Sequence, residues 1–421
     1  MPTPSTSNGA PGLVLFLGMV RRGEFESLRQ RGLPLGVLID TNSKHRLADV
    51  SGFAFVERFD FSRPLTDLIA AVREIRTTRN VACLINVMEY YVAETAAVAA
   101  ALGLPGISPA SAALCRDKCT MRRRFQQQIG PHATARFEVV DSEAGLLDAA
   151  GMLEYPVFLQ PSNVAASMWS TRNTHPEMLR ANYHAMLHEV PAFYQQLGRK
   201  DARLTVVLAE YLEGINTSID CLADAAGRVY TTPVVDVLTG QDVGIDDYHH
   251  FARIVPSCLD PMEQAELERL AVAGVQALGM TSSAAHVEFI GRRLGEIAAR
   301  PGGNRARILE LAHGIDLLHA YYQVLCGRRP ELRAELQGSA AILTPFAPRG
   351  GTMRAIRHLD RLIRLGTYLY HEVREQPGHP VGLAKNGCRA PLYIELQSAD
   401  AAAVRRDVAE IASWQDLYEL E

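Results

Sequence analysis

Short apolar runs alternate with helix-like stretches over the first hundred residues, and this alternation limits the fold more than any other feature. LVLFLGM at 13–19, LGVLID at 35–40 and VACLINV at 81–87 have the length and apolar character of buried strands. Helical patterns lie between these runs and after the last of them, in LTDLIAAVREIRTT and ETAAVAAALGL. Strands that alternate with helices at this spacing predict a parallel α/β sheet. No GxGxxG follows the first run, so a dinucleotide site there is not expected.

The bulk composition fits a soluble enzyme-sized protein and excludes some partners. A chain of 421 residues is too long for one ordinary core, which favours two or three packed units. The net charge of −4 gives no reason to expect nucleic acid or an anionic membrane as partner, and no apolar run approaches the roughly 20 residues of a membrane helix. The polar residues 1–12 lack the order of a signal peptide and are expected to form a disordered leader. The seven scattered cysteines favour reduced thiols in a cytoplasmic protein.

The pattern changes after residue 110. Residues 111–129 predict one amphipathic helix that ends at Gly130-Pro131, and 162–200 is expected to be rich in loops. Further elements are predicted by local pattern: strand signals around a helix in 133–165, a hairpin in 216–239 that turns at 225–227, helices in 261–279 and 354–370, a strand in LYIEL and a helix in AAAVRRDVAEI.

Two acids eight residues apart are the most informative local feature. In HVEFIGRRLGEIAARPGGNR, at 286–305, a hairpin that turns at Arg292 would place Glu288 opposite Glu296 on one sheet face. Facing carboxylates repel unless a proton is shared, a basic side chain inserts or a hard divalent cation binds between them. Mg²⁺ accepts one or two carboxylates when phosphates and waters complete its octahedron. On spacing alone, a metal site and an exposed, solvated hairpin explain the pair equally well.

The residues after the pair favour a ligand site. Arg300 is expected to continue along the face that carries the two acids, and Pro301 ends the strand. Gly302 and Gly303 would let backbone N–H groups approach a ligand closely. Two acids, a guanidinium and a glycine turn together suit a site that holds Mg²⁺ and stabilises a charged phosphoryl or acyl intermediate.

On these motifs the sequence resembles the ATP-grasp enzymes, and among them the carboxylate–amine ligases. HVEF and LGEIAARPGG resemble the paired metal-binding glutamates of that family, over an element order that spans about 13–325. The resemblance implies an α/β protein with a parallel α/β domain at 13–112 and an ATP-grasp region at 113–325, with a small β-rich lid at about 131–208. It also implies that an antiparallel sheet lies in the larger domain and that residues 326–421 pack on it.

The resemblance also implies ligands and roles for single residues. ATP and Mg²⁺ (or Mn²⁺) would be bound, with Glu288 and Glu296 as metal ligands and Arg300, Gly302 and Gly303 stabilising charge at the reacting centre. The nucleotide side resembles the family in RDKCTMR, YPVFLQP and AEYLEG, which implies contacts from Lys118, Gln160, Glu210, Tyr211 and Leu212.

Several positions depart from the family pattern. Gln160 stands where a second lysine is expected, and a neutral amide lacks the charge that strengthens phosphate contacts. Asn163, Ala165, Ala166 and Ser167 replace most glycines of the phosphate-covering loop, and Ala298 replaces an asparagine that is commonly a metal ligand. His249, His250 and His286 are candidates for contact with a substrate, although an ordinary surface or core position is the favoured interpretation of each.

The resemblance implies an ATP-dependent ligase that activates a small carboxylate, such as an amino acid, as an acylphosphate and joins it to an amine. Its substrates would be small molecules, and a homodimer is a common arrangement in the resembled family. The departures motivate the alternative of a catalytically weakened protein that binds a nucleotide or metabolite. A biotin-dependent carboxylase subunit is less favoured, because the chain has no Met-Lys-Met biotinyl motif.

Overall fold

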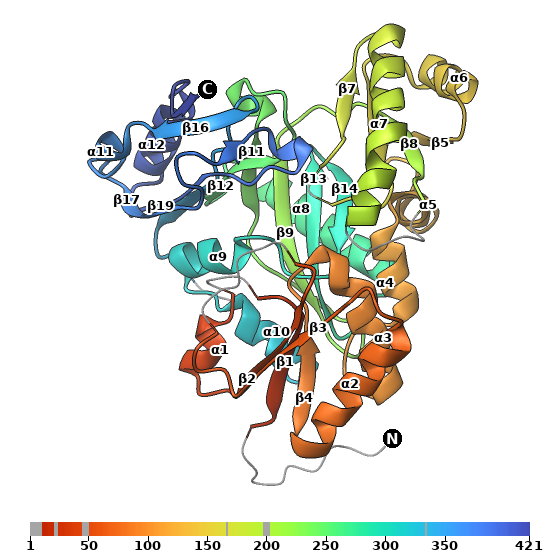
Figure 1. Cartoon of the computed structure of the whole chain (residues 1–421), viewed down its shortest axis with the longest axis vertical. Helices are drawn as coiled ribbons and strands as arrows, with labels where there is room; N and C mark the ends of the chain where they lie inside the picture. The colour runs from red at the N-terminus through yellow and green to blue at the C-terminus, as the bar shows by residue number, and fades with distance from the viewer. Residues whose placement is uncertain (1–10, 21–23, 44–49, 166, 197–202, 333–334) are drawn as a thin grey trace.

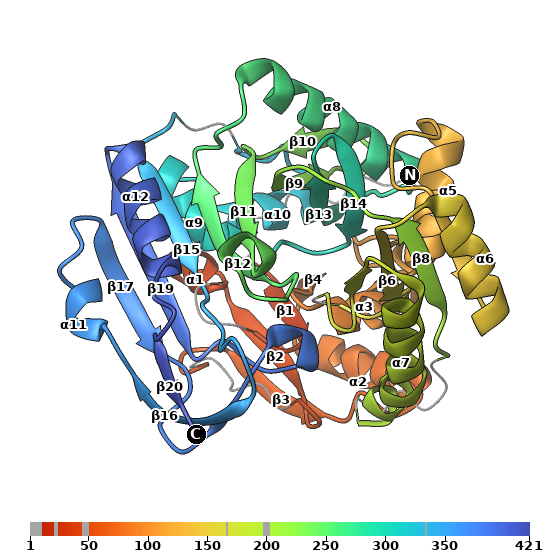
Figure 2. The ribbon, with the colours of Figure 1, turned by 90° about the horizontal axis from the view of Figure 1, so that it is seen from above.

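The computed structural model describes residues 11–20, 24–43, 50–165, 167–196, 203–332 and 335–421. Strands within these residues form four sheets, and Figures 1 and 2 show their arrangement. Most of the expected leader at 1–12 lies outside the described residues. No helix in the described part of the chain is both long and apolar enough to cross a membrane.

The N-terminal region is a parallel α/β sheet, as predicted. Its strand order is β3-β2-β1-β4, and every pair is parallel. The strand β3 was not predicted, because three central residues of FVERF are exposed and the run lacks an apolar signature. The elements here are β1 (Leu13–Gly18), α1 (Glu26–Gln30), β2 (Leu35–Asp40), β3 (Phe55–Phe59), α2 (Leu65–Thr78), β4 (Val81–Ile85), η1 (Glu89–Tyr91) and α3 (Val92–Leu102).

The helix predicted at 111–129 is two helices, α4 (Pro109–Arg116) and α5 (Lys118–Gln128). Asp117 adopts an extended conformation between them, and its side chain accepts hydrogen bonds from the amides of Cys119 and Thr120. An aspartate that caps a new helix satisfies amides that would otherwise lack partners. The break therefore places Lys118 at the first position of α5.

The third region is a four-stranded antiparallel sheet of order β5-β8-β6-β7 with two helices. Its elements are β5 (Phe137–Val140), α6 (Glu143–Leu153), β6 (Val157–Pro161), β7 (Thr171–Asn173), α7 (Pro176–Gln196) and β8 (Val206–Glu210). The prediction that 162–200 is loop-rich is wrong, since α7 alone spans 21 residues. Its buried side chains recur every three to four residues, a helical signal that Pro191 obscured: Leu179, Tyr183, Met186, Val190 and Tyr194.

A nine-stranded sheet forms the centre of the molecule, with the path β14-β13-β9-β11-β12-β15-β19-β17 and β10 paired to β9. The predicted hairpin at 216–239 and helix at 261–279 are present. The elements are β9 (Asn216–Ala223), β10 (Val229–Thr231), β11 (Val235–Thr239), η2 (Gln241–Val243), β12 (His250–Val255), α8 (Pro261–Ala277), β13 (Ser283–Ile290), β14 (Arg293–Ala298), α9 (Arg305–His313) and α10 (Leu317–Leu325).

The core that joins the sheets centres on α10. Eight of its nine residues are buried, and seven of these, all but Gln323, belong to one apolar cluster with Val14 and Phe16 of β1 and Leu222 of β9. This packing fixes the carboxyl edge of the parallel sheet close to the central sheet, and Figure 1 shows α10 beside β1 below the central strands. The relative positions of η1, β13 and β14 depend on that core.

The last ninety residues continue the central sheet through β15 (Ser339–Leu343), β17 (Tyr368–Val373) and β19 (Leu392–Ser398). The helix predicted at 354–370 is wrong. That segment contains the end of β16 (Gly351–Ile356), the one-turn α11 (Leu359–Leu362) and the start of β17, because pairing of β16 to β20 and of β17 to β19 satisfies its backbone. The remaining elements are β18 (Pro380–Val381), η3 (Ala384–Asn386), α12 (Ala401–Ala412) and β20 (Tyr418–Leu420).

Candidate active site

The acidic hairpin forms as predicted, with one difference in its turn. Glu288 of β13 pairs with Glu296 of β14. The turn consists of Gly291 and Arg292, so Ile290 pairs with Arg293, and a register shift after Glu288 then brings the two acids opposite each other. The two carboxylates are thus neighbours on one face of the central sheet.

Basic side chains contact both carboxylates. The Lys118 ammonium lies 3.0 Å from Glu296 Oε2, and His286 Nε2 lies 3.2 Å from Glu288 Oε1. His250 Nε2 is 3.7 Å from the same Glu288 oxygen. The sequence left open how the repulsion between the two carboxylates is relieved, and the structure shows basic side chains beside both of them. Both glutamates nevertheless remain partly accessible, at 36% and 23% of their side chains, so they can still accept a ligand.

A buried aspartate controls the charge of this site. Asp220 of β9 accepts from His286 Nδ1 at 3.2 Å, and Gly302 N donates to it at 2.6 Å. Burial opposes the charged form of His286, but Asp220 and Glu288 outweigh it and raise the pKa of His286. Burial likewise acts against ionised Glu288, but the hydrogen bond from His286 and the nearby cations hold the pKa of Glu288 far below its usual range. Glu288 is therefore ionised at neutral pH.

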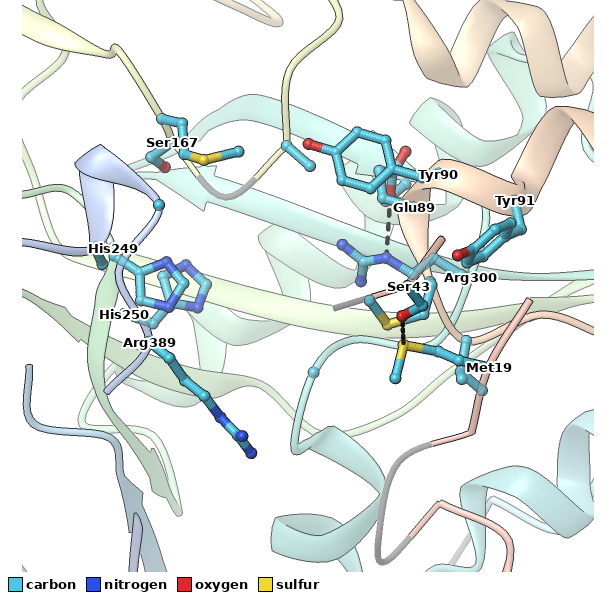
Figure 3. A pocket seen from close by; sticks show the side chains of 18 of the residues that line it. Met19, Ser43, Glu89, Tyr90, Tyr91, Ser167, His249, His250, Arg300 and Arg389 are labelled. Atoms are coloured by element: carbon cyan, nitrogen blue, oxygen red, sulfur yellow. Dashed lines mark hydrogen bonds and ion pairs between the residues drawn. The ribbon is translucent and has the colours of Figure 1, made fainter. Parts of the chain in front are cut away.

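The two glutamates line a cavity of about 1640 Å³ between the parallel sheet, the central sheet and the region of the four-stranded antiparallel sheet. Arg300, Ala298 and Gly303 line the same cavity, together with His249 and His250. Figure 3 shows Arg300, Glu89, Tyr90 and Tyr91 on one side of this space and His249, His250 and Arg389 on the other. The prediction that Arg300 shares a surface with the two acids agrees with this lining, although β14 ends two residues before it.

Arg300 has a buried partner that sequence analysis missed. Its Nε donates to Glu89 Oε2 at 3.0 Å, and Arg116 Nη1 donates to Glu89 Oε1 at 2.7 Å. Burial alone would raise the pKa of Glu89, but the two guanidinium groups hold it below the ordinary glutamate value. Glu89 follows β4 at the carboxyl edge of the parallel sheet, where ligand sites of α/β proteins gather, and that position was the available signal.

The two glycines have different surroundings. The amide of Gly302 already donates to Asp220, and a Cβ at this position would lie 2.3 Å from His286 Nδ1. Gly302 is therefore required for close packing, and its N–H is engaged within the protein. Gly303 lines the cavity, and its carbonyl accepts from Arg305.

The residues predicted on the nucleotide side lie outside the lining of this cavity. Lys118 and Gln160 are buried next to the acidic hairpin, and Lys118 Nζ also donates to the carbonyl of Val164 at 3.1 Å. Oriented toward α5, the Gln160 amide oxygen accepts from Arg122 Nη2 at 2.7 Å and Nη1 at 3.2 Å. A buried guanidinium from α5 thus contacts the residue that stands where the resembled pattern has a second lysine.

The strand β8 ends at Glu210, and Tyr211 and Leu212 follow it directly. Glu210 Oε2 accepts from Arg136 Nε at 2.9 Å, and Glu210 also pairs with Arg293 of the acidic hairpin. Burial opposes its ionisation, but hydrogen bonds from Arg136 and the nearby guanidinium groups lower the pKa of Glu210. The ion pair between Glu210 and Arg293 links the four-stranded antiparallel sheet to β14, the strand that carries Glu296.

The histidines were interpreted as ordinary residues, and their positions show more. His286 is buried, as expected of a core histidine, but it contacts Glu288. Burial lowers the pKa of His250 well below its usual value, so this ring is neutral beside the same carboxylate. Strand pairing brings Asp220, His286 and Glu288 together from two separate segments, and no local sequence pattern reveals that contact.

The acidic hairpin fits a hard divalent cation. It presents two partly accessible carboxylates on adjacent strands, and Mg²⁺ accepts one or two carboxylates if phosphates and water supply its other ligands. Among the described residues, no group of three or more His, Cys, Asp or Glu side chains forms a metal site by itself. A cation here would therefore depend on a ligand for most of its coordination.

Comparison with solved structures confirms the fold that the sequence resemblance implies. The chain superposes on the L-amino acid ligase from Bacillus licheniformis with a TM-score of 0.78, at 16% identity, over 98% of this chain and 99% of that one. The N5-carboxyaminoimidazole synthetase from Staphylococcus aureus in complex with ADP gives a TM-score of 0.72 at 13% identity, over 96% and 97% of the two chains.

One curated protein shows detectable sequence similarity to the chain. Carnosine synthase 1 from Gallus gallus is 27% identical over 400 residues, which cover 88% of this chain and 42% of that protein. The chain thus spans less than half the length of that relative. No family model matches the sequence.

Proposed function

We propose that this protein is an ATP-dependent carboxylate–amine ligase that joins a small carboxylate, such as an amino acid, to an amine. One observation carries the proposal: Glu288 and Glu296 face each other on adjacent strands, in a large cavity that Arg300 also lines, within an ATP-grasp fold. The similarity to carnosine synthase 1 and to an L-amino acid ligase supports the same class of reaction.

In this proposal Glu288 and Glu296 hold Mg²⁺. A divalent cation held by these two carboxylates would supply positive charge that stabilises the transferred phosphoryl group. His286 and Asp220 keep Glu288 ionised and oriented, since His286 contacts both carboxylates. Lys118 lies against Glu296 and Arg122 against Gln160, so both cations are placed to meet phosphate oxygens when the lid region closes on a nucleotide.

The reaction needs no protein nucleophile. The substrate carboxylate attacks the γ-phosphorus of ATP, ADP leaves, and an acylphosphate forms. The amine then attacks the acyl carbon, phosphate leaves and the amine loses a proton, which gives an amide. Arg300, which its ion pair with Glu89 holds in place, would stabilise negative charge at the reacting carbonyl.

The remaining parts of the proposal concern the setting of the reaction. All seven cysteines are free thiols, which is consistent with the reducing conditions of the cytoplasm. Manganese could replace magnesium at two carboxylates, because both ions favour oxygen ligands. A homodimer and the division into three domains stay predictions.

The test is release of ADP and phosphate when pairs of amino acids are added with Mg-ATP. We expect at least one pair to stimulate release, and chelation by EDTA to abolish it. Glu296→Gln should lower the rate at least about 10³-fold, because a metal contact to transferring phosphoryl oxygens contributes several kcal/mol.

The control is Glu266→Gln, a similar change at an exposed glutamate on α8, which should leave the rate unchanged. If no pair stimulates release while Glu296→Gln folds normally and is equally silent, the ligase proposal fails. Binding of ATP without Mg²⁺ dependence in calorimetry would then favour the alternative of a nucleotide-binding protein without turnover.

A further inference from the structure

Residues 383–390, between β18 and β19, form a segment that we call the strap. Two of its residues, Ala384 and Ala390, are buried in an apolar cluster with Phe346 and Leu392. The strap is therefore packed on the region of the last ninety residues. It also forms part of the wall of the cavity, through Ala384, Asn386, Gly387, Cys388, Arg389 and Ala390.

A buried aspartate fixes the strap to the loop that carries His249. Asp247 is 0% exposed, and its Oδ2 accepts a hydrogen bond from the backbone N–H of Lys385 at 2.8 Å. Its Oδ1 accepts from the backbone N–H of His249, also at 2.8 Å. Hydrogen bonds to a carboxylate are stronger than those between neutral groups. The side chain of Lys385 adds an ion pair with Asp246, but Asp246 is 81% exposed, and exposed pairs contribute little.

Trp169 lies opposite the strap and is held within the region of the four-stranded antiparallel sheet. Its Nε1 donates to Glu189 Oε2 of α7 at 2.7 Å, and its ring centre lies 5.0 Å from that of Phe193 on the same helix. Ser167 and Trp169 have positive φ angles of 52° and 56°, which are costly for residues other than glycine. Contacts with α7 therefore keep this turn in place, and Trp169 moves with that helix.

The strap and the turn of Trp169 meet at a weak junction. The N–H of Trp169 donates to the carbonyl of Lys385 at 3.5 Å, which is longer than most hydrogen bonds. Beside it, a Cβ at Gly387 would lie 3.8 Å from Met168 Sδ, so the strap backbone is close to that side chain. Lys385 thus bridges two regions through its own peptide groups: its N–H binds Asp247, and its carbonyl accepts from Trp169.

Firm anchors on both sides and a weak contact between them are what a closure that opens for substrates requires. Ser167, Met168 and Trp169 line the cavity on one side of the junction, and the strap lines it on the other. Figure 3 shows Ser167 above His249 and His250, with Arg389 below them. Separation of the junction would therefore open the cavity to water along this wall.

We propose that the strap closes the cavity by docking on residues 167–169, with Asp247 and Lys385 as its positioning residues, and that this closure keeps water from the acylphosphate. The inference rests on the proposed ligase function. The step that closure prevents is attack of water on the intermediate, which releases phosphate and returns the carboxylate without forming an amide. ADP is released in either case, so loss of closure separates ATP consumption from amide formation.

The first measurement is the amount of phosphate released per amide formed, with Mg-ATP and the amino-acid pair found active in the ligase assay. Asp247→Asn keeps the shape of the side chain, but one of the two N–H groups then faces an amide nitrogen. We expect about one phosphate per amide in the unmodified protein and about 3-fold more in Asp247→Asn, since water then reaches the intermediate. A variant that was merely destabilised would lose both products together.

Hydrogen exchange of the protein without ligands tests the junction itself. The amide of Trp169 should exchange about 10-fold faster in Asp247→Asn, together with the amides of the strap, because its acceptor on Lys385 is no longer held. Lys385→Met should change exchange little, since it removes only the ion pair with exposed Asp246. Asp360→Asn, at a surface aspartate that is 75% exposed, is the matched control and should behave as the unmodified protein.

Met168→Ala tests the junction from the other side, and it replaces Asp247→Asn if that variant does not fold. We expect the same two changes, faster exchange at Trp169 and more phosphate per amide, because the side chain beside Gly387 is lost.

Unchanged phosphate per amide in the folded variants overturns the exclusion of water by the strap. Faster exchange in the strap without a change at Trp169 overturns the docking contact. If no amino-acid pair releases ADP, the ligase function fails by itself. Exchange then decides the docking of the strap: a faster Trp169 amide in the variants supports it, and no change overturns it.

Discussion

Arg300 and Arg253 line the same cavity, but their charges are balanced in different ways. Arg300 shares the buried carboxylate of Glu89 with Arg116, at 3.0 and 2.7 Å. Arg253 donates only to a carbonyl and a hydroxyl, and no acidic side chain of the described residues pairs with it. One guanidinium of the cavity thus has a carboxylate partner, and the other forms no ion pair with a carboxylate of the described residues.

The comparison separates two kinds of charged side chain in one cavity: those that stabilise the fold and those that remain available to a ligand. Glu89 is 5% exposed and has two cations, so its environment satisfies it within the protein. Glu288 and Glu296 are more accessible, with 36% and 23% of their side chains exposed. Charges that the fold neutralises hold elements together, whereas charges that it leaves accessible are available to substrate, nucleotide and metal.

The largest effect on stability should come from Glu89→Gln. The change leaves Arg116 and Arg300 without their shared carboxylate, and loss of one member of a buried ion pair costs about 3 kcal/mol or more. Urea unfolding at pH 7 measures the loss of free energy. A loss below about 1 kcal/mol would mean that Glu89 does not stabilise the fold through its ion pairs with Arg116 and Arg300.

Acidification provides an internal control for the same variant. The folded-state pKa of Glu89 is below its unfolded value, so its contribution is complete above the unfolded pKa and disappears as the pH falls through the folded one. The difference between Glu89→Gln and the unmodified protein should therefore be full at pH 7 and shrink below about pH 4. A difference that does not depend on pH would exclude the ion pair as its cause.

A smaller effect is expected from Gly302→Ala, which tests whether this glycine serves packing. The new Cβ would lie 2.3 Å from His286 Nδ1 and 2.5 Å from Arg305 Cγ, so two buried side chains must move. We expect a loss of about 1–3 kcal/mol in thermal or urea unfolding. Gly151→Ala, in an open position on α6, is the control and should gain up to about 1 kcal/mol from helix propensity. Equal stability of the two variants would contradict the packing role.

The smallest effect on stability should come from Arg253→Met. The variant loses two hydrogen bonds but also removes an unpaired buried charge, so the free energy of unfolding should stay within about 1 kcal/mol of the unmodified value or rise. The measurement is urea unfolding in the absence of substrates, beside Glu89→Gln. A loss of unfolding free energy as large as that of Glu89→Gln would mean that Arg253 stabilises the fold. Arg253 and Arg300 would then not differ in this respect.

Patterns within one segment predicted much of the fold. The apolar runs at 13–19, 35–40 and 81–87 gave the parallel sheet, because buried parallel strands are continuously apolar. Predictions were wrong where local propensity competed with tertiary context. Asp117 splits a predicted helix by capping a new one, and residues 354–370 pair with distant strands instead of forming a helix.

The sequence by itself placed Glu288 and Glu296 on the two adjacent strands of one short hairpin, whereas their direct pairing depends on the register shift between Glu288 and Phe289. Only the tertiary structure decided what surrounds them. Glu89 reaches Arg300 across 211 residues and Asp220 reaches His286 across 66, through packing of separate sheets. The surroundings of Arg253 could not be predicted from the sequence either. Whether a carboxylate pairs with it depends on which distant segments pack beside it when the chain folds.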